Sequence, residues 1–241
     1  MLHGSFAIDA VIRYGQDVQK AKYLGKECEF SGRVKVLDVG CGKGLQGRII
    51  KDYGNDVVGL TIRDKEDSGA GYNGQLLDNV IYEDFLTYTS KEKFDIIWAS
   101  HILEHISDIS AFISSIRRNI RKGGMLALTV PAMDHNVLLA HIHYFNAGYL
   151  LRNLVVNGID CRDAMIKVYD YNLSIIIPSV SNIKAVEITG NKIEKQIACM
   201  EKENSLFQYF PREVEYYKNW NGEFTFDGNI YEMNWKVDTI Y

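Results

Sequence analysis

The chain has 241 residues, of which 46% are hydrophobic and 24% charged, and its formal net charge is −4. This length and composition suit one sizeable globular domain with an appended part. The slightly acidic balance argues against a nucleic-acid partner, because proteins that bind nucleic acids usually carry a basic surface. No apolar run is long enough to span a bilayer and no secretory leader is recognisable, so we expect no membrane insertion.

The four cysteines stand at positions 28, 41, 161 and 199, without a CxxC pair. This spacing predicts neither a zinc site nor a disulfide framework. Unpaired cysteines are typical of a reducing compartment, so we expect a cytoplasmic protein.

The N-terminal residues 5–24 carry apolar side chains at roughly helical spacing and predict one or two helices. The stretch VKVLDVGCGKG follows at residues 34–44. It predicts a buried strand, then a loop with glycines at 40, 42 and 44, then an amphipathic helix from Leu45. Glycines allow backbone N–H groups to approach a ligand, and a helix N-terminus after such a loop favours anions. Asp38, just before the first glycine, offers an acceptor for a ligand's ammonium or hydroxyl groups.

The segment DVGCGKG resembles motif I of the class I S-adenosylmethionine-dependent methyltransferases, whose pattern is (D/E)xGxGxG. Residues 42–47 also spell GxGxxG, the dinucleotide fingerprint. In that fingerprint the first glycine comes directly off the strand, whereas here Gly40 does so. The methyltransferase resemblance is therefore favoured, and it implies S-adenosylmethionine as cofactor and S-adenosylhomocysteine as product.

Two further strands supply the other cofactor contacts that the resemblance implies. Residues 56–62 read as a strand that ends at Thr61 and Ile62. The family usually has an acid there that accepts from both ribose hydroxyls, and a threonine cannot accept in the same way. Residues 79–85 read as a strand ending in Asp84 and Phe85, which in the family contact the adenine amino group and ring. Asp84 serves equally well as a helix N-cap.

The fourth strand is predicted at 94–100, and HILEH follows it at 101–105. This pair resembles the family's fourth-strand motif and adds Ser100 to the cofactor contacts. A helix is predicted from an N-cap at Ser107 or Asp108 to Arg121, stopped by residues 122–124. A fifth strand at 125–131 completes four strand-helix alternations, which predict a parallel sheet with the ligand at the strands' carboxyl ends.

The rest of the chain predicts a helix over residues 143–158, with Tyr149, Leu150, Leu154 and Val155 on its apolar side, and then two strands joined near 169–172. The resemblance implies an α/β, Rossmann-like, doubly wound and mostly parallel seven-stranded sheet with a closing antiparallel hairpin. We expect residues 1–30 to form a helical lid over the ligand, residues 31–180 the core, and residues 181–241 a C-terminal extension. Tyr14 in the lid is either a packing aromatic or a ligand contact. The extension holds eleven aromatic residues after position 205, so we expect it to be folded, as a cap, a homodimer contact or a wall of the acceptor pocket.

Five of the six histidines lie between positions 101 and 143. Histidine is the commonest general base near neutral pH, so His101, His141 and His143 are candidates for deprotonating an acceptor hydroxyl. Residues 141–145, HIHYF, resemble a stretch after the fifth strand of bacterial sugar and small-molecule methyltransferases. We therefore expect O-methylation of a small polar acceptor, a sugar or nucleotide-sugar of a surface polysaccharide.

Three alternatives stay open. His101, Glu104 and His105 would share one face of a helix and could bind a divalent cation that positions a diol or catechol. This arrangement resembles the ExxEH pattern of quinone-biosynthesis O-methyltransferases with His101 in place of the first acid, and we favour a site without metal. An amine acceptor would make the chain an N-methyltransferase. A loss of catalysis would leave a methyltransferase-like binding module.

Overall fold

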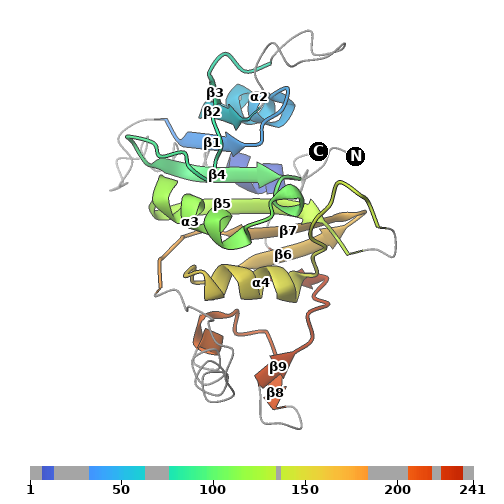
Figure 1. The fold of residues 1–241 in the computed structure, drawn as a ribbon. Helices are drawn as coiled ribbons and strands as arrows, with labels where there is room; N and C mark the ends of the chain where they lie inside the picture. Colours follow the sequence, from blue (N-terminus) through green and yellow to red (C-terminus); the bar gives the residue numbers. More distant parts are fainter. Residues whose placement is uncertain are drawn as a thin grey trace.

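The computed structural model describes residues 7–13, 33–62, 76–133, 137–183, 206–218 and 224–235. Its main feature is an eight-stranded sheet in the order β10-β6-β7-β5-β4-β1-β2-β3 (Figure 1). The strands are β1 (Lys35–Val39), β2 (Asp56–Thr61), β3 (Val80–Tyr82), β4 (Phe94–Ser100), β5 (Ile120–Pro131), β6 (Met165–Tyr169), β7 (Asn172–Ile177) and β10 (Glu232–Met233). Neighbours from β3 to β5 are parallel, and β5, β7, β6 and β10 pair antiparallel.

The predicted fold class is therefore confirmed, with one correction. The sheet has an eighth strand, because the two-residue strand β10 pairs with β6 through Glu232 opposite Lys167 and Met233 opposite Ile166. The predicted hairpin is β6 and β7, joined at Asp170, whose φ of 49° makes the tight turn. The strand order reverses beside β1, and such switch points are where open α/β sheets bind ligands.

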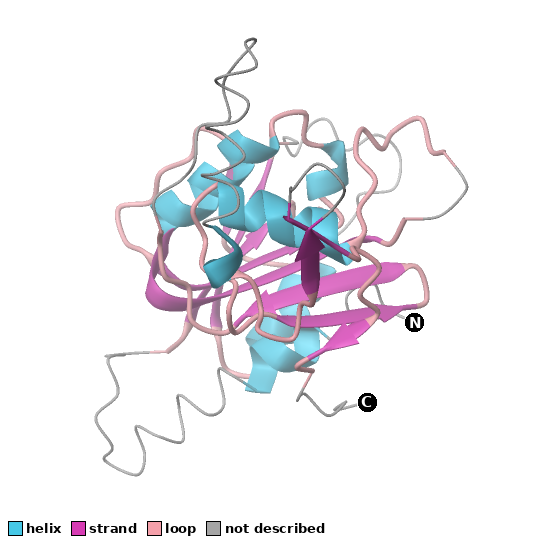
Figure 2. Ribbon diagram, turned by 90° about the horizontal axis from the view of Figure 1, so that it is seen from below, coloured by secondary structure: helices cyan, strands magenta, loops and turns pink. Residues whose placement is uncertain are grey.

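Helices cover both faces of the sheet, as Figure 2 shows. One face carries α2 (Leu45–Asp52) and the helical residues 7–13, which pack on alternating side chains of β1, β2 and β4. Alternation along a strand sends the remaining side chains to the other face. There α3 (Ile109–Asn119) and α4 (Ala147–Val156) pack on β4, β5, β6 and β7.

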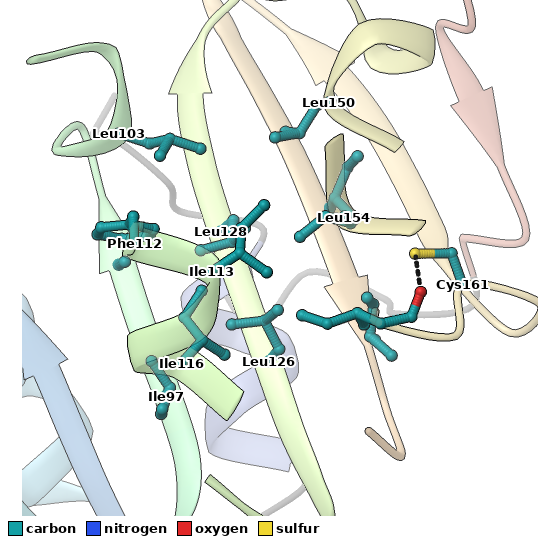
Figure 3. Close-up of a cluster of buried hydrophobic side chains, with 14 of the residues drawn as sticks. Ile97, Leu103, Phe112, Ile113, Ile116, Leu126, Leu128, Leu150, Leu154 and Cys161 are labelled. Carbon is teal, nitrogen blue, oxygen red and sulfur yellow. Dashed lines mark hydrogen bonds between the residues drawn. The ribbon is translucent and has the colours of Figure 1, made fainter. Parts of the chain in front are cut away.

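Figure 3 shows the hydrophobic side chains buried between the sheet and the helices α3 and α4. Phe112, Ile113 and Ile116 of α3 and Leu150 and Leu154 of α4 are fully buried against this face. Cys161 closes the cluster: its thiol donates to the Ile159 carbonyl at 3.6 Å, and burial raises its pKa well above the ordinary value. Each Å² of apolar surface buried in this cluster stabilises the fold by roughly 25 cal/mol. The sheet therefore holds the loops at its edge in fixed positions.

The ends of the helices follow from local hydrogen bonds. Asp108 is the N-cap of α3, and its carboxylate accepts from the Ala111 N–H at 2.8 Å. The helix ends at Asn119 and not at Arg121, because β5 begins at Ile120. Residues 122–124, predicted to stop the helix, lie within β5, where its pairing with β4 shifts in register.

The helix α4 begins after Asn146, whose side chain accepts from the Tyr149 N–H at 2.8 Å, and it ends before Gly158, whose φ is 92°. Its buried side includes Leu151. Tyr149, predicted on the apolar side, is 41% exposed, which corrects that prediction. The reason is that Leu150 and Leu151 both point inward and rotate the buried stripe away from position 149.

The described parts of the C-terminal region are the short helix η3 (Leu206–Tyr209), a hairpin of β8 (Tyr216–Lys218) and β9 (Phe224–Phe226), and β10. The Gly148 N–H in α4 donates to the Gly228 carbonyl at 2.9 Å, and the Phe226 ring lies 5.3 Å from that of Phe210. These parts pack on α4 and β6. The division into lid, core and extension stays a prediction, and Tyr14 lies outside the described residues.

Candidate functional site

The loop after β1 is built from three glycines in the left-handed region, with φ values of 71°, 52° and 77° at Gly40, Gly42 and Gly44. A Cβ at Gly44 would stand 2.8 Å from Leu77 Cγ, and one at Gly40 would stand 3.0 Å from Ile102 Cδ1. Residues with a side chain rarely adopt this backbone, so the loop requires glycine. The contact with Ile102 also places the glycine loop directly against the turn that follows β4.

Asp38 lies beneath this loop and is 2% exposed. Burial raises the pKa of its carboxyl to about 7, although the Gly47 N–H donates to it and lowers the pKa in part. Its Oδ2 has no hydrogen-bond partner in the segments that the structure describes. A buried carboxylate with a free oxygen is suited to a ligand's ammonium group, because the cation would offset the cost of burial.

Gln46, in the first turn of α2, connects the glycine loop to β4. It accepts from the Trp98 indole N–H at 3.2 Å and donates to the Ser100 hydroxyl at 3.3 Å. Ser100 is thereby held at the end of β4, beside the glycine loop. The sequence did not identify Gln46, because a glutamine in an amphipathic helix carries no signal of such a contact.

The ends of β2 and β3 hold the residues predicted to contact a ribose and an adenine. Thr61 is half-buried at the end of β2, and Ile62 directly after it is 75% exposed. An apolar side chain exposed at this edge is available to cover the face of a ring. Asp84 is exposed after β3, and its side chain accepts from the Leu86 N–H at 2.9 Å. This bond closes a turn over residues 85–87, where the structure has no helix, so Asp84 is not the helix N-cap that the sequence also allowed.

Phe85, predicted to contact the adenine ring, follows Asp84 directly. It is 5% exposed, and its ring packs edge-on against Phe112 with 5.0 Å between centroids. The ring therefore packs in the core, and its contact with adenine stays a prediction.

His101 follows Ser100 with a φ of 54°, a strained backbone for a residue other than glycine. Its Nε2 lies 2.8 Å from Asn172 Oδ1, and its Nδ1 lies 3.3 Å from Glu104 Oε1. Both ring nitrogens therefore face oxygen atoms of the protein. This arrangement fixes the orientation of the His101 ring. The partner Asn172 carried no recognisable signal in the sequence.

Glu104 and His105 lie in one turn of 3-10 helix, η2 (Leu103–His105), and not in the longer helix expected. Glu104 is 1% exposed, whereas the His105 side chain is 40% exposed. The backbone carbonyl of Glu104 accepts from the N–H groups of Ile142 and His143, at 2.8 and 3.2 Å. These bonds join the turn after β4 to the loop between β5 and α4.

That loop brings His141 and His143 to the same place. The His141 ring lies 5.0 Å from the His105 ring and 6.2 Å from the Tyr144 ring. The Nε2 of His143 is buried and has no hydrogen-bond partner among the described residues. The structure thus gathers four of the five clustered histidines, and the fifth, at position 135, lies outside the described residues.

The sheet order, the left-handed glycine loop and the polar cluster at one sheet edge define a class I methyltransferase domain. A comparison with protein families agrees: residues 7–156 match the model described as a methyltransferase domain. The chain belongs to this family of S-adenosylmethionine-dependent methyltransferases. The family's cofactor is S-adenosylmethionine, its product is S-adenosylhomocysteine, and its reactions fall in EC class 2.1.1.

Among curated proteins, the chain is similar to the ubiquinone biosynthesis O-methyltransferase of Rhizobium etli, with 27% identity over 143 residues, covering 53% of this chain and 56% of that protein. It is also similar to the enzyme of the same name from Psychrobacter cryohalolentis, with 29% identity over 146 residues, covering 57% and 54%. The chain spans about half the length of these curated relatives.

Among solved structures, the chain resembles an N1-methyltransferase from Burkholderia thailandensis with bound 1,6-didemethyltoxoflavin and S-adenosylhomocysteine. The TM-score is 0.49 at 16% identity, covering 73% of this chain and 80% of that one. No helix in the described part of the chain has the length and hydrophobicity needed to cross a membrane.

Proposed function

We propose that this chain transfers the methyl group of S-adenosylmethionine to a hydroxyl oxygen of a small organic acceptor. The observation that carries the proposal is the contact between Gly40 and Ile102. It sets the glycine loop beside the turn that holds His101, Glu104 and His105. Methyl transfer to oxygen needs this proximity of donor and acceptor, together with a group that removes the hydroxyl proton.

His143 is the candidate for the base. Its Nε2 has no partner among the described residues, whereas both nitrogens of His101 face protein oxygens. The bond from its backbone N–H to the Glu104 carbonyl holds His143 beside the turn after β4. In this proposal His143 takes the hydroxyl proton as the oxygen attacks the methyl carbon and the C–S bond of the sulfonium breaks.

The acceptor carries an apolar part. Val137, Leu138, Leu139 and Ile142 are between 54% and 103% exposed, in the loop that holds His141 and His143. Large apolar side chains exposed together mark a binding surface. The sugar or nucleotide-sugar predicted from the sequence would leave these side chains in water, and the names of the curated relatives do not support it. A phenol or catechol that carries an alkyl chain fits the loop better, and methylation at oxygen agrees with those names.

The test is a transfer assay with methyl-labelled S-adenosylmethionine and three acceptor panels: alkyl phenols and catechols, sugars and nucleotide-sugars, and amines. Mass spectrometry locates the added methyl group. We expect an O-methyl product from the first panel and a loss of turnover in His143→Gln. An N-methylated product would favour the alternative amine acceptor. Binding of S-adenosylhomocysteine without transfer to any panel would favour the non-catalytic module.

A further inference from the structure

The acceptor side of the site contains a buried carboxylate that the mechanism above does not use. Glu104 is 1% exposed, and within the described part of the chain neither of its carboxylate oxygens has a hydrogen-bond partner. Burying a carboxylate without compensation costs several kcal/mol. Two groups of the described residues could offset its charge: His101 Nδ1 and His105 Nε2, at 3.3 and 3.8 Å from Oε1.

The orientation of His105 shows what this carboxylate faces. His105 Nδ1 lies 2.7 Å from the Ala140 carbonyl oxygen, which can only accept, so Nδ1 carries a proton. In the neutral ring, Nε2 then carries a lone pair, and it lies 3.8 Å from Glu104 Oε1. A cation between these two electron-rich groups, either a proton or a metal ion, would offset their repulsion. Histidines that bind metals characteristically donate their other N–H to a backbone carbonyl, as His105 does.

A third ligand comes from the opposite loop. One ligand atom each from Glu104, His105 and His141 lie within 4.8 Å of one another. The Ile142 N–H donates to the Glu104 carbonyl at 2.8 Å and fixes the backbone next to His141. Metal–ligand bonds of about 2.0–2.2 Å would draw these three atoms slightly closer together, which small side-chain rotations of the partly exposed histidines allow.

We propose that Glu104, His105 and His141 bind one divalent cation of the Zn²⁺ type. Two imidazoles and one carboxylate favour Zn²⁺ and similar transition metals, whereas Mg²⁺ prefers oxygen ligands. The set differs from the arrangement considered in the sequence, because His141 replaces His101. The Nε2 of His101 is directed to Asn172, and its backbone is held by the Thr129 carbonyl at 2.8 Å.

The consequence for catalysis rests on the proposed function. Three protein ligands leave a coordination position open, and an acceptor hydroxyl bound there would lose its proton more readily. His143, two residues from His141, would receive that proton. Cation binding itself does not depend on this role and can be measured without any acceptor.

The experiment is a calorimetric titration of EDTA-treated and dialysed protein with Zn²⁺ at pH 7.5, with Co²⁺ absorption as a second readout of ligand geometry. We expect one Zn²⁺ per chain. Glu104→Gln and His141→Ala should each weaken binding by at least about 100-fold, whereas the matched control His143→Gln should retain it. Thermal unfolding of each variant shows whether it is folded.

Three results would overturn the proposal: no Zn²⁺ binding by the folded protein, equal binding by wild type and both ligand variants, or equal loss in His143→Gln. The first would mean that a proton on His105 neutralises Glu104, and the others that Zn²⁺ binds adventitiously. A parallel titration with S-adenosylhomocysteine separates the two claims. If the cofactor product binds and Zn²⁺ does not, only the cation site is wrong; if the cofactor product fails to bind, the proposed function is wrong.

Discussion

The cofactor side and the acceptor side of this site are built in different ways. The cofactor side consists of backbone held in a left-handed conformation by Gly40, Gly42 and Gly44, next to one buried carboxyl group. The acceptor side consists of histidine side chains on two loops, joined through Glu104. A site made of backbone tolerates few substitutions, whereas a site made of loop side chains can change its acceptor and keep its cofactor. Five predictions sharpen this difference, from the largest expected effect to the smallest.

Replacing the base should affect turnover alone. We expect His143→Gln to lower kcat by about 10²- to 10⁴-fold, the usual contribution of a general base, with little change in the affinity for S-adenosylhomocysteine. Initial rates and calorimetry measure the two quantities. Tyr149→Phe is a suitable control, because this exposed residue has no proposed role. A variant that loses affinity and turnover together would show that His143 supports the cofactor side.

Gly44→Ala should weaken the binding of the cofactor product, because Gly44 belongs to the cofactor side of the site. The added Cβ would meet Leu77 Cγ at 2.8 Å, and a left-handed backbone costs a residue with a side chain about 1–2 kcal/mol. We expect the affinity for S-adenosylhomocysteine to fall by roughly 100-fold, because the loop must move. Gly54→Ala is the matched control, since Gly54 has a φ of 92° at the end of α2, outside the loop. Equal losses of affinity in both variants would mean that general strain, and not the loop, is responsible.

The affinity for S-adenosylhomocysteine should also depend on pH through Asp38. Burial raises the pKa of this carboxyl to about 7 in the free protein, and a bound ammonium group would lower it, so that binding releases a proton. The affinity should therefore fall about tenfold between pH 8 and pH 6. Asp38→Asn should bind more weakly, with a flatter profile. A wild-type profile as flat as that of the variant would contradict the proposed pairing.

The same carboxyl also makes stability depend on pH. The pKa of Asp38 is about 7 in the folded protein and 3.8 in the unfolded chain. The folded state therefore keeps the full contribution of the protonated carboxyl to the free energy of unfolding below pH 3.8, and loses it as the pH rises through 7. Unfolding of the free protein over this range should show this contribution, and Asp38→Asn should remove it.

The smallest effect is expected at Ile62. This side chain is 75% exposed without a ligand, so Ile62→Ala should leave the free energy of unfolding nearly unchanged. If Ile62 covers a ring of the cofactor, the affinity should fall about five- to tenfold, because one apolar contact is lost. Phe85→Leu is the contrasting variant: it should reduce stability through its contact with Phe112 and leave the affinity unchanged. The reverse pattern would restore Phe85 as the adenine contact.

The difference between the two sides also explains which parts of the fold and of the site could be predicted from the sequence. The glycine loop depends on local spacing, and the residues from Val34 to Gly44 contain that information. The alternation of strands and helices is likewise readable segment by segment. The N-cap at Asp108 and the turn at Asp170 are local features of the same kind. Family membership was recognisable for this reason.

The acceptor side depends on contacts between residues far apart in the sequence. Glu104 and His141 come from different loops, and His101 meets Asn172 across 71 positions, so spacing could not separate the roles of the histidines. The strand β10 was missed because two residues carry no periodicity. The contact of Phe85 with Phe112 on α3 also joins residues that are distant in the sequence, and the adenine contact of Phe85 stays a prediction.

The central claim is that the glycine loop binds the methyl donor beside the histidine cluster. The most direct test is a calorimetric titration of the purified chain with S-adenosylhomocysteine, followed by NADH. We predict one site of micromolar affinity for S-adenosylhomocysteine and no heat from NADH. A folded protein that binds NADH, or neither compound, would contradict the assignment.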